Sequence, residues 1–215
     1  MHIPDGFIPL LQCAVYWLMA AAFIALSLRW ARRELDESRV PLLAVLAAGI
    51  FALQAINIPI PWGTSGHVVG GVLTAIIFAS PWAGVLVLTL VLVVQGLVFA
   101  DGGITVMGAN ILLMGVVSTF VGYYTYTALR RVRLPTLGSA FVGAWTGLFT
   151  SALACALVLV AAGTFPLVEG LLFMGTYHAV IGLVAEGIIT VAVLTLLMYA
   201  APEMLPENLR RGVQA

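Results

Sequence analysis

Residues 83–100 read AGVLVLTLVLVVQGLVFA and contain no charged side chain. An α-helix needs about 20 predominantly apolar residues to cross the hydrocarbon core of a membrane, so this stretch predicts a transmembrane helix. The rest of the chain has the same character. It is 62% hydrophobic and 8% charged, with a mean hydropathy of +1.13, whereas soluble domains carry about 25% charged residues. We therefore predict an all-α integral membrane protein.

Apolar stretches of this kind recur on both sides of residues 83–100. The sequence predicts seven transmembrane helices, at residues 9–28, 42–57, 68–81, 83–100, 104–128, 138–162 and 171–200. The second and third are short, and only residues 80–82 separate the third from the fourth, so six helices are the alternative. Neither a repeat nor a soluble domain boundary is recognisable, which predicts a single membrane domain over residues 1–215.

The arginines decide the orientation. The nine basic residues are Arg29, Arg32, Arg33, Arg39, Arg130, Arg131, Arg133, Arg210 and Arg211. With seven helices all of them fall on one side of the membrane, which the positive-inside rule makes cytoplasmic; six helices would split them between the two sides. Seven helices therefore place residues 1–8 and the 58–67 loop outside, and the tail, residues 201–215, in the cytoplasm.

Composition also excludes several classes of function. The chain has no lysine, so it cannot form the phosphate-binding loop of an ATPase, which needs one. Low charge excludes nucleic-acid binding, which requires clustered basic residues. Cys13 and Cys155 lie in apolar stretches and are expected to be small buried residues rather than metal thiolates. No positive n-region or cleavage site precedes the first apolar stretch, so we expect no cleavable signal peptide in this sequence; the alternatives are a natural start at Met1 and a leader removed earlier.

The amino terminus, Met1-His2-Ile3-Pro4-Asp5-Gly6, can form a metal chelate. The α-amine, the next backbone nitrogen and the His2 imidazole can bind one ion together, closing rings of five and six members. Such a nitrogen set suits Ni(II) or Cu(II), and also Co(II). A fourth nitrogen would come from His67 or His178. The bland alternative is a histidine with no function, but the Pro-Asp-Gly turn favours a terminus folded back on the protein.

Two further polar groups lie in the last predicted helix. Eight residues separate His178 from Glu186, so both side chains face broadly the same way. A carboxylate at this depth is costly and is expected to be functional, protonated, or hydrogen-bonded between helices. Asn57, Gln95 and Asn110 are expected to form hydrogen bonds between helices.

Three motifs together resemble the CbiM/NikM family: residues 1–7, His67 within Ser65-Gly66-His67, and the stretch from His178 to Glu186. The resemblance extends over essentially the whole chain. Members of that family are the substrate-binding (S) components of energy-coupling factor importers for nickel and cobalt. The resemblance implies a six-helix S-component core plus one amino-terminal helix, in a prokaryotic cytoplasmic (inner) membrane. It also implies partners, namely a transmembrane coupling subunit, cytoplasmic ATPase subunits and often a small extra membrane subunit.

Carried onto this chain, the family's metal site falls on the Met1 amine, the His2 backbone nitrogen and imidazole, and the His67 imidazole. The pair Pro4-Asp5 resembles nickel-type members, so the resemblance implies Ni(II) as transported substrate, with Co(II) as the alternative and no organic cofactor. His178 and Glu186 remain candidates for an indirect or structural role.

Other residues receive predicted roles around that site. The side chains that could orient the imidazoles by accepting their second N–H are Asp5, Asn57 and Asp101. Small residues at Ala44, Ala48 and Ala52 recur every four positions and predict a face for close helix packing. The resemblance implies that this face docks on the coupling subunit.

Two other functions compete with a capture subunit. A stand-alone secondary transporter or channel would need a continuous polar path, and the predicted helices contain few polar residues. A metalloenzyme using His178 and Glu186 would need a ligand cluster such as His-Glu-x-x-His, which the sequence lacks.

Overall fold

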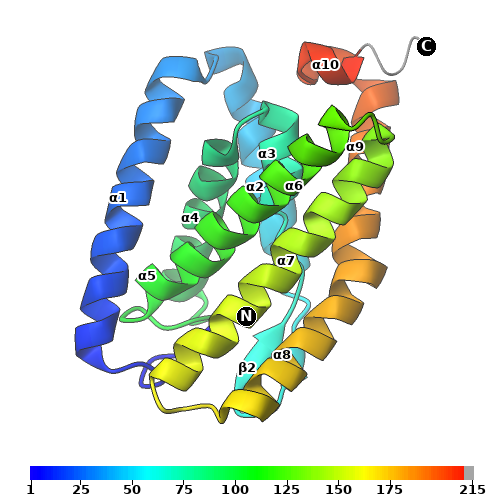
Figure 1. The fold of residues 1–215 in the computed structure, drawn as a ribbon. Coiled ribbons are helices and arrows are strands. Elements are labelled where there is room, and N and C mark those ends of the chain that lie inside the picture. The colour runs from blue at the N-terminus through cyan, green and yellow to red at the C-terminus, as the bar shows by residue number, and fades with distance from the viewer. Residues whose placement is uncertain (211–215) are drawn as a thin grey trace.

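The computed structural model describes residues 1–210, which form a bundle of helices (Figure 1). Within that range the segments long and apolar enough to cross a membrane are Leu10–Glu34, Glu37–Gln54, Pro81–Val98, Met107–Arg131, Thr136–Ala161 and Leu167–Ala200. The prediction of a mostly helical, multi-pass membrane protein is confirmed, whereas the third of the seven predicted helices, residues 68–81, is not among these segments. Arg211 and the rest of the predicted tail after residue 210 lie outside the described residues.

Most helices follow one another with short connections, and the long connection between α2 and α3 contains a β-hairpin. Their order is α1 (Leu10–Glu34), η1 (Glu37–Arg39), α2 (Val40–Gln54), α3 (Gly71–Phe78), α4 (Pro81–Val98), α5 (Met107–Asn110), η2 (Ile111–Ser118), α6 (Thr119–Arg131), α7 (Thr136–Ala161), α8 (Leu167–Ile181), η3 (Gly182–Glu186), α9 (Gly187–Ala200), η4 (Pro202–Met204) and α10 (Glu207–Arg210). The long helices 107–131 and 167–200 each contain a stretch of π-helix, η2 and η3. Such stretches in α-helices are frequent at functional sites.

The segment predicted as a helix over residues 68–81 differs most from expectation. A hairpin of β1 (Ile58–Ile60) and β2 (Thr64–Gly66) precedes it. Residues 67–70 are not helical, and α3 has only eight residues, all of them buried. Gly70 has φ +77°, a left-handed conformation that an α-helix cannot continue. Within the predicted helix 68–81, residues 68–70 are therefore irregular chain and only the eight residues of α3 form the expected helix.

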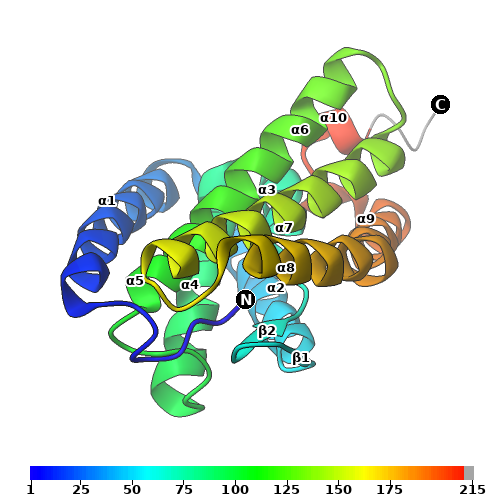
Figure 2. The ribbon, with the colours of Figure 1, turned by 60° about the horizontal axis from the view of Figure 1, so that its bottom comes forward.

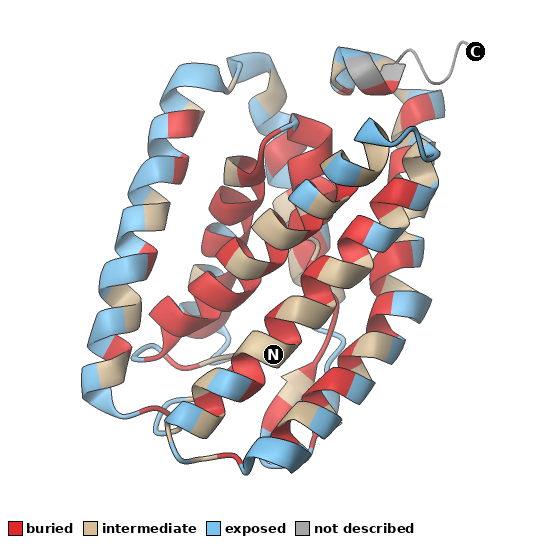
Figure 3. Ribbon diagram, viewed as in Figure 1, coloured by how far each residue is buried: buried red, intermediate tan, exposed pale blue. Residues whose placement is uncertain are grey.

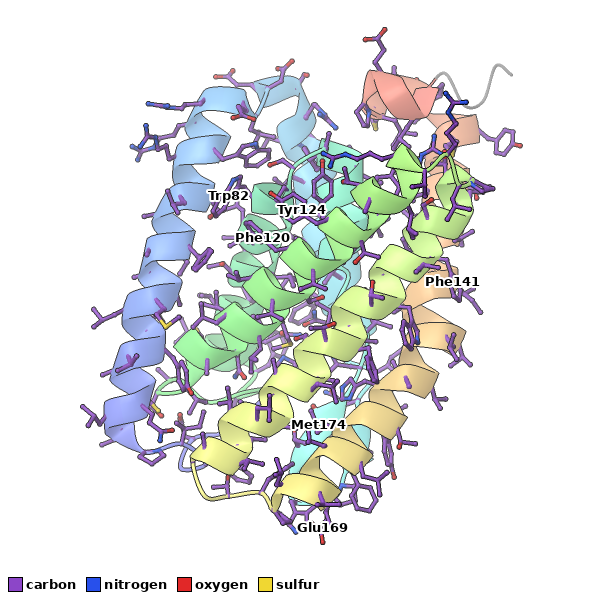
Figure 4. The ribbon with its side chains drawn as sticks, viewed as in Figure 1. Trp82, Phe120, Tyr124, Phe141, Glu169 and Met174 are labelled. Carbon is purple, nitrogen blue, oxygen red and sulfur yellow. The ribbon has the colours of Figure 1, made fainter. Side chains whose placement is uncertain are left out.

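Burial is uneven across the bundle. Figure 3 shows α3, α4 and the α5–η2 region mostly buried and α1 mostly exposed. Only 17% of the apolar window of α1 is buried, against 72% for Met107–Arg131. In the second half of α1, Phe23 packs against the bundle. The centroid of its ring lies 6.1 Å from the ring centroids of both Trp82 and Phe120. Figure 4 shows the last two rings together.

The two ends of the bundle have different chemistry. In Figure 1 the β-hairpin and the starts of α1 and α8 lie at one end, here named the hairpin end. The η1 turn, the α6–α7 connection and α10 lie at the opposite end, here named the arginine end because Arg39, Arg130, Arg131 and Arg133 belong to it. The amino-terminal segment packs at the hairpin end, beside β2 (Figure 2).

Candidate metal centre

Residues 1–3 are buried inside the hairpin end. The exposed fractions of Met1, His2 and Ile3 are 0%, 5% and 0%. The backbone of Ile3 is paired on both sides, because its N–H donates to Asn110 Oδ1 at 3.0 Å and its carbonyl accepts from Asn110 Nδ2 at 3.1 Å. Gly103 N–H also donates to the Ile3 carbonyl, at 3.0 Å. The amino terminus is thus an ordered part of the fold.

Asp5 fastens the turn that leads back to α1. Its carboxylate accepts hydrogen bonds from Ile104 N at 3.0 Å, from Thr105 N at 2.8 Å and from the Thr105 hydroxyl. The hydroxyl bond lowers the pKa of Asp5 from its ordinary value. A Cβ on Gly103 would lie 2.2 Å from Asp5 Oδ1, so only glycine fits there. Asp5, predicted to orient an imidazole, instead bonds to the 104–105 backbone.

The Met1 amine is buried against the β-hairpin. It donates to the Ser65 carbonyl and lies 3.3 Å from Ser65 Oγ. The neighbouring Thr64 hydroxyl donates to the His2 carbonyl at 3.2 Å. Burial lowers the pKa of the Met1 amine to about 5, because a charged amine loses its hydration there. At neutral pH the amine is therefore uncharged, with a lone pair available for a metal.

The His2 ring lies flat against the His67 ring, with centroids 4.5 Å apart and planes 20° from parallel. His2 Nε2 is 3.2 Å from Gln95 Oε1, an acceptor, so the tautomer with the ring proton on Nε2 satisfies this contact. Nδ1 then carries a bare lone pair 3.3 Å from Asp101 Oδ1, without a hydrogen bond within residues 1–210. Burial, then the charge of the amine, lowers the pKa of His2 to about 4. Nδ1 is the nitrogen that closes a six-membered chelate ring with the His2 backbone nitrogen.

His67 is also left with one bare nitrogen. Its Nδ1 lies 2.7 Å from the Val68 carbonyl. A carbonyl only accepts, so Nδ1 carries the proton and Nε2 does not. The side chain is 1% exposed, and Nε2 has no partner in the described chain. The fold therefore brings together two unprotonated imidazole nitrogens and a neutral amine.

Asn57 and Asp101 lie at the opening of this site. Asn57 Nδ2 donates to Asp101 Oδ2 at 3.4 Å, and the Asp101 side chain is 30% exposed. Both residues line a cavity of about 410 Å³, and His2 lines it as well. Asp101 was predicted to accept a ring N–H, but its Oδ1 faces the bare Nδ1 of His2, and the acceptor near the other ring nitrogen is Gln95. Asn57 reaches the site only through Asp101.

His178 and Glu186 bond to backbone rather than to the other candidate groups. His178 Nδ1 lies 2.8 Å from the Met174 carbonyl on its own helix, and its buried Nε2 has no partner among residues 1–210. Glu186 accepts from Val69 N at 2.6 Å and from Gly70 N at 2.9 Å. Of the predicted roles for Glu186, hydrogen bonding between segments is the one observed.

Several groups around the site were not predicted. Ser65 and Thr64 hold the amino-terminal backbone, and the only sequence signal was their place next to His67. Gln95 and Asn110 were expected to bond between helices; this was wrong, because both bond to residues 2 and 3. An amide in an otherwise apolar helix signals a polar partner without identifying it.

Side-chain clusters alone do not reveal this centre. Across residues 1–210 no three His, Cys, Asp or Glu side chains lie close enough to hold a metal. Main-chain nitrogens supply half of the predicted donors. Cys155 is buried, with Sγ 3.9 Å from the Met1 carbonyl, as expected for a small buried residue rather than a thiolate.

Comparisons with known proteins match this chain to metal transport proteins. A model of the family described as "cobalt uptake substrate-specific transmembrane region" (CbiM) matches residues 2–204. A solved structure of a transition metal transporter superposes with a TM-score of 0.87 at 30% identity, covering 98% of this chain and 97% of that one.

Curated relatives agree with that match. A Haloquadratum walsbyi protein named for metal transport is 42% identical over 206 residues, which are 95% of this chain and 93% of that protein. An Archaeoglobus fulgidus protein named for fused nickel transport (NikMN) is 39% identical over 214 residues, 99% of this chain and 70% of the relative. The cobalt transport protein CbiM of Sorangium cellulosum is 33% identical over 215 residues, 95% of this chain and 94% of the relative.

Proposed function

This chain belongs to the CbiM family of nickel and cobalt transport proteins, and from that premise we propose that it is the substrate-capture subunit of an energy-coupling factor importer. It binds Ni(II), or Co(II), from the extracytoplasmic side. Partner subunits hydrolyse ATP and drive uptake. The chain itself performs no catalysis.

The proposed donors are the Met1 amine, the His2 backbone nitrogen, His2 Nδ1 and His67 Nε2. The observation that carries the proposal is the pair of stacked imidazoles, each with a bare nitrogen, beside a buried amine. The His2 backbone N–H donates no hydrogen bond within the described residues, so its proton can be released without breaking one. Metal binding displaces protons from its ligands in this way.

An all-nitrogen donor set favours nickel over cobalt. Affinity for divalent ions at such sites rises from Co(II) to Ni(II) to Cu(II). Square-planar nitrogen coordination is typical of Ni(II) and Cu(II). Nickel is therefore the proposed substrate, cobalt is the alternative, and copper is excluded by its availability in the cell rather than by the site.

The ion reaches the site through the cavity of about 410 Å³ at the hairpin end. Asp101 is partly exposed there and attracts a dication toward His2. The amino-terminal segment, fastened by Asp5 and Asn110, covers the donors from one side. Release requires the body to reorient when the ATPase subunits cycle.

The proposed orientation has the chain crossing the membrane seven times. Residues 67–70 and α3 together make the third crossing, although α3 has only eight residues. Irregular backbone is tolerated at that depth when protein buries it, and residues 67–69 are buried. The hairpin end with Met1 then faces outside, and the arginine end faces the cytoplasm.

The α2 helix is the proposed docking face for the transmembrane coupling subunit. Ala44, Ala48 and Ala52 are all exposed, and a Cβ on Gly49 would meet nothing within 4 Å. Small residues allow a second helix to approach closely. The ATPase subunits bind at the cytoplasmic side of the assembly, and a small extra membrane subunit is the remaining proposed partner.

Blocking the amine tests the ligand set directly. Protein whose Met1 amine is acetylated, or extended by a tag, should bind no stoichiometric Ni(II), because both chelate rings depend on that terminus. His67→Ala should weaken binding by orders of magnitude while leaving the three-nitrogen chelate. Metal analysis, titration and visible spectroscopy on untagged protein provide the measurements, with a carboxy-terminal tag as the matched control.

Two results would contradict the proposal. Stoichiometric binding by amine-blocked protein removes Met1 from the ligand set. Uptake of nickel by vesicles that contain this chain alone, insensitive to ATP depletion, favours a stand-alone secondary transporter instead.

A further inference from the structure

Residues 67–70, which carry the fourth proposed donor, are held by side chains from distant helices. One peptide group joins Val68 to Val69. Its carbonyl, which belongs to Val68, lies 2.7 Å from His67 Nδ1. Its N–H, which belongs to Val69, lies 2.6 Å from Glu186 Oε2. Those two atoms belong to one rigid planar unit. A continuous chain of hydrogen bonds thus runs from the Glu186 carboxylate through a single peptide group to the His67 ring.

The next peptide group is fixed in the same way. The Val69 carbonyl accepts from Gln54 Nε2 at 3.0 Å, and the Gly70 N–H donates to Glu186 Oε1 at 2.9 Å. Two adjacent N–H groups therefore share one carboxylate, each with its own oxygen. A carboxamide has only one acceptor oxygen, so glutamine cannot replace both bonds.

Burial strengthens these hydrogen bonds, because the dielectric constant is low inside a protein. Val69 is 0% exposed, His67 1% and Glu186 2%. Such positions are shielded from bulk solvent, and a hydrogen bond there polarises the next one in its chain. A negative carboxylate on the Val69 N–H makes the Val68 carbonyl a stronger acceptor. That carbonyl in turn holds the proton on His67 Nδ1 and leaves more electron density on Nε2.

We propose that Glu186 is a positioning residue for the metal centre: through the Val68–Val69 peptide group it fixes the direction and the tautomer of His67 and strengthens Nε2 as a donor. The inference rests on the proposed function, in which His67 Nε2 binds the ion. Partners of this kind on the second ring nitrogen fix metal-binding histidines in many proteins. Here the carboxylate acts at one remove, with a peptide group between it and the ring.

The same contact joins the metal centre to the last long helix. Glu186 is the final residue of the π-helical stretch η3, between α8 and α9. Its hydrogen bonds are made to the segment between β2 and α3, far away in sequence. A shift of that helix relative to residues 67–70 would therefore turn the His67 ring out of the position that it holds here.

A double-mutant cycle tests the inference. Glu186→Gln should weaken Ni(II) binding roughly 10–100-fold, the usual effect of removing such a partner. It should also shift the visible absorption of the nickel complex toward that of His67→Ala. In the His67→Ala background, Glu186→Gln should change the affinity less than about threefold, because Glu186 acts through that ring. Glu169→Gln is the matched control, because it changes the same charge at an exposed site on α8 (Figure 4) and should leave affinity unchanged.

Several outcomes separate this inference from the proposed function. Wild-type affinity in Glu186→Gln overturns the inference, and so does an equal loss in both backgrounds, which indicates a general effect on the fold. Wild-type affinity in His67→Ala refutes the proposed ligand set and the inference with it. If Glu186→Gln does not yield monodisperse protein, Glu186→Asp keeps the charge, shortens the reach by one methylene and is expected to show the same dependence on His67.

Discussion

The proposed donors share one property at the scale of single residues: each is uncharged before a metal arrives. Burial lowers the pKa of the Met1 amine to about 5 and that of His2 to about 4. An amine on an exposed chain end has an ordinary pKa near 8 and is mostly protonated at pH 7. Folding has therefore already removed the protons that an ion would otherwise displace from the amine and the imidazole.

Proton release on metal binding measures this property. At pH 7 one Ni(II) should release about one proton, that of the His2 backbone nitrogen, because the amine and the imidazoles are already neutral. Affinity should fall as the pH is lowered, and more steeply below about pH 5, where the amine takes up a proton. Titration calorimetry at pH 7 in two buffers of different ionisation enthalpy counts the protons.

The matched control is a synthetic peptide of residues 1–7 with a free amine. Its exposed amine should release a second proton on binding, so about two in total. If the folded protein also releases two or more, its amine is charged before binding, and burial does not prepare the donor.

At the scale of elements, residues 68–81, predicted as the third helix, show what could not be predicted from the sequence. The Gly70-Gly71 pair was the only local sign of a break inside the predicted helix 68–81, and hydropathy alone favoured a continuous helix. The break is stable because Glu186 and Gln54 satisfy the backbone groups that it exposes. In the sequence, Glu186 is more than 100 residues from this segment and Gln54 about 15, so no local pattern reveals either partner.

The metal centre was likewise predictable from the sequence only in part. Met1, His2 and His67 could be proposed from the motif, since the chelate is local and the family resemblance supplied the last donor. The ring tautomers depend on Gln95 and on the Val68 carbonyl, and these follow only from the packing of distant segments. Asp5 was predicted to orient an imidazole, but its carboxylate binds residues 104–105 instead, a role that only the fold reveals.

Gly70→Ala tests the break directly. Gly70 has φ +77°, and a Cβ there would lie 2.6 Å from Ile50 Cγ1. Left-handed strain and overpacking each cost roughly 1–3 kcal/mol, so the variant should lose at least about 2 kcal/mol of stability. It should also bind Ni(II) more weakly, because the backbone that carries His67 shifts. Thermal unfolding in detergent and nickel titration give the two readouts.

Gly138→Ala is the control for that variant. Gly138 lies near the start of α7, and a Cβ there would meet nothing within 4 Å. Alanine in a helix is expected to be neutral or to stabilise by roughly 0.5–1 kcal/mol. Equal unfolding temperatures for the two variants would mean that residue 70 tolerates a side chain and that the break is not fixed by its glycine.

At the scale of the whole molecule, charge and metal chemistry lie at opposite ends. The arginine end carries every described loop that is rich in basic residues, while the hairpin end carries the amine, both stacked imidazoles and Asp101. An odd number of crossings places the amino-terminal segment and α10, which lie at these two ends, on opposite sides of a membrane. The proposed orientation therefore depends on whether residues 67–78 count as a crossing.

Two introduced cysteines decide between seven crossings and six. Ser38→Cys lies in η1 at the arginine end, and Glu169→Cys lies near the start of α8 at the hairpin end. With seven crossings, a membrane-impermeant maleimide should label position 169 in intact cells and position 38 only after permeabilisation. With six, the two positions would lie on the same side, because one fewer crossing stands between them.

The native cysteines provide the background for this experiment. Cys13 and Cys155 are both buried, so the parent protein should react with the reagent on neither side of the membrane. Labelling of both introduced cysteines in intact cells would remove the third crossing. It would also place the arginines of residues 130–133 on the side opposite those of residues 29–39, against the positive-inside rule. The broken third segment must then lie within one half of the membrane, and the metal centre could no longer be assigned to the outer face from the arginines.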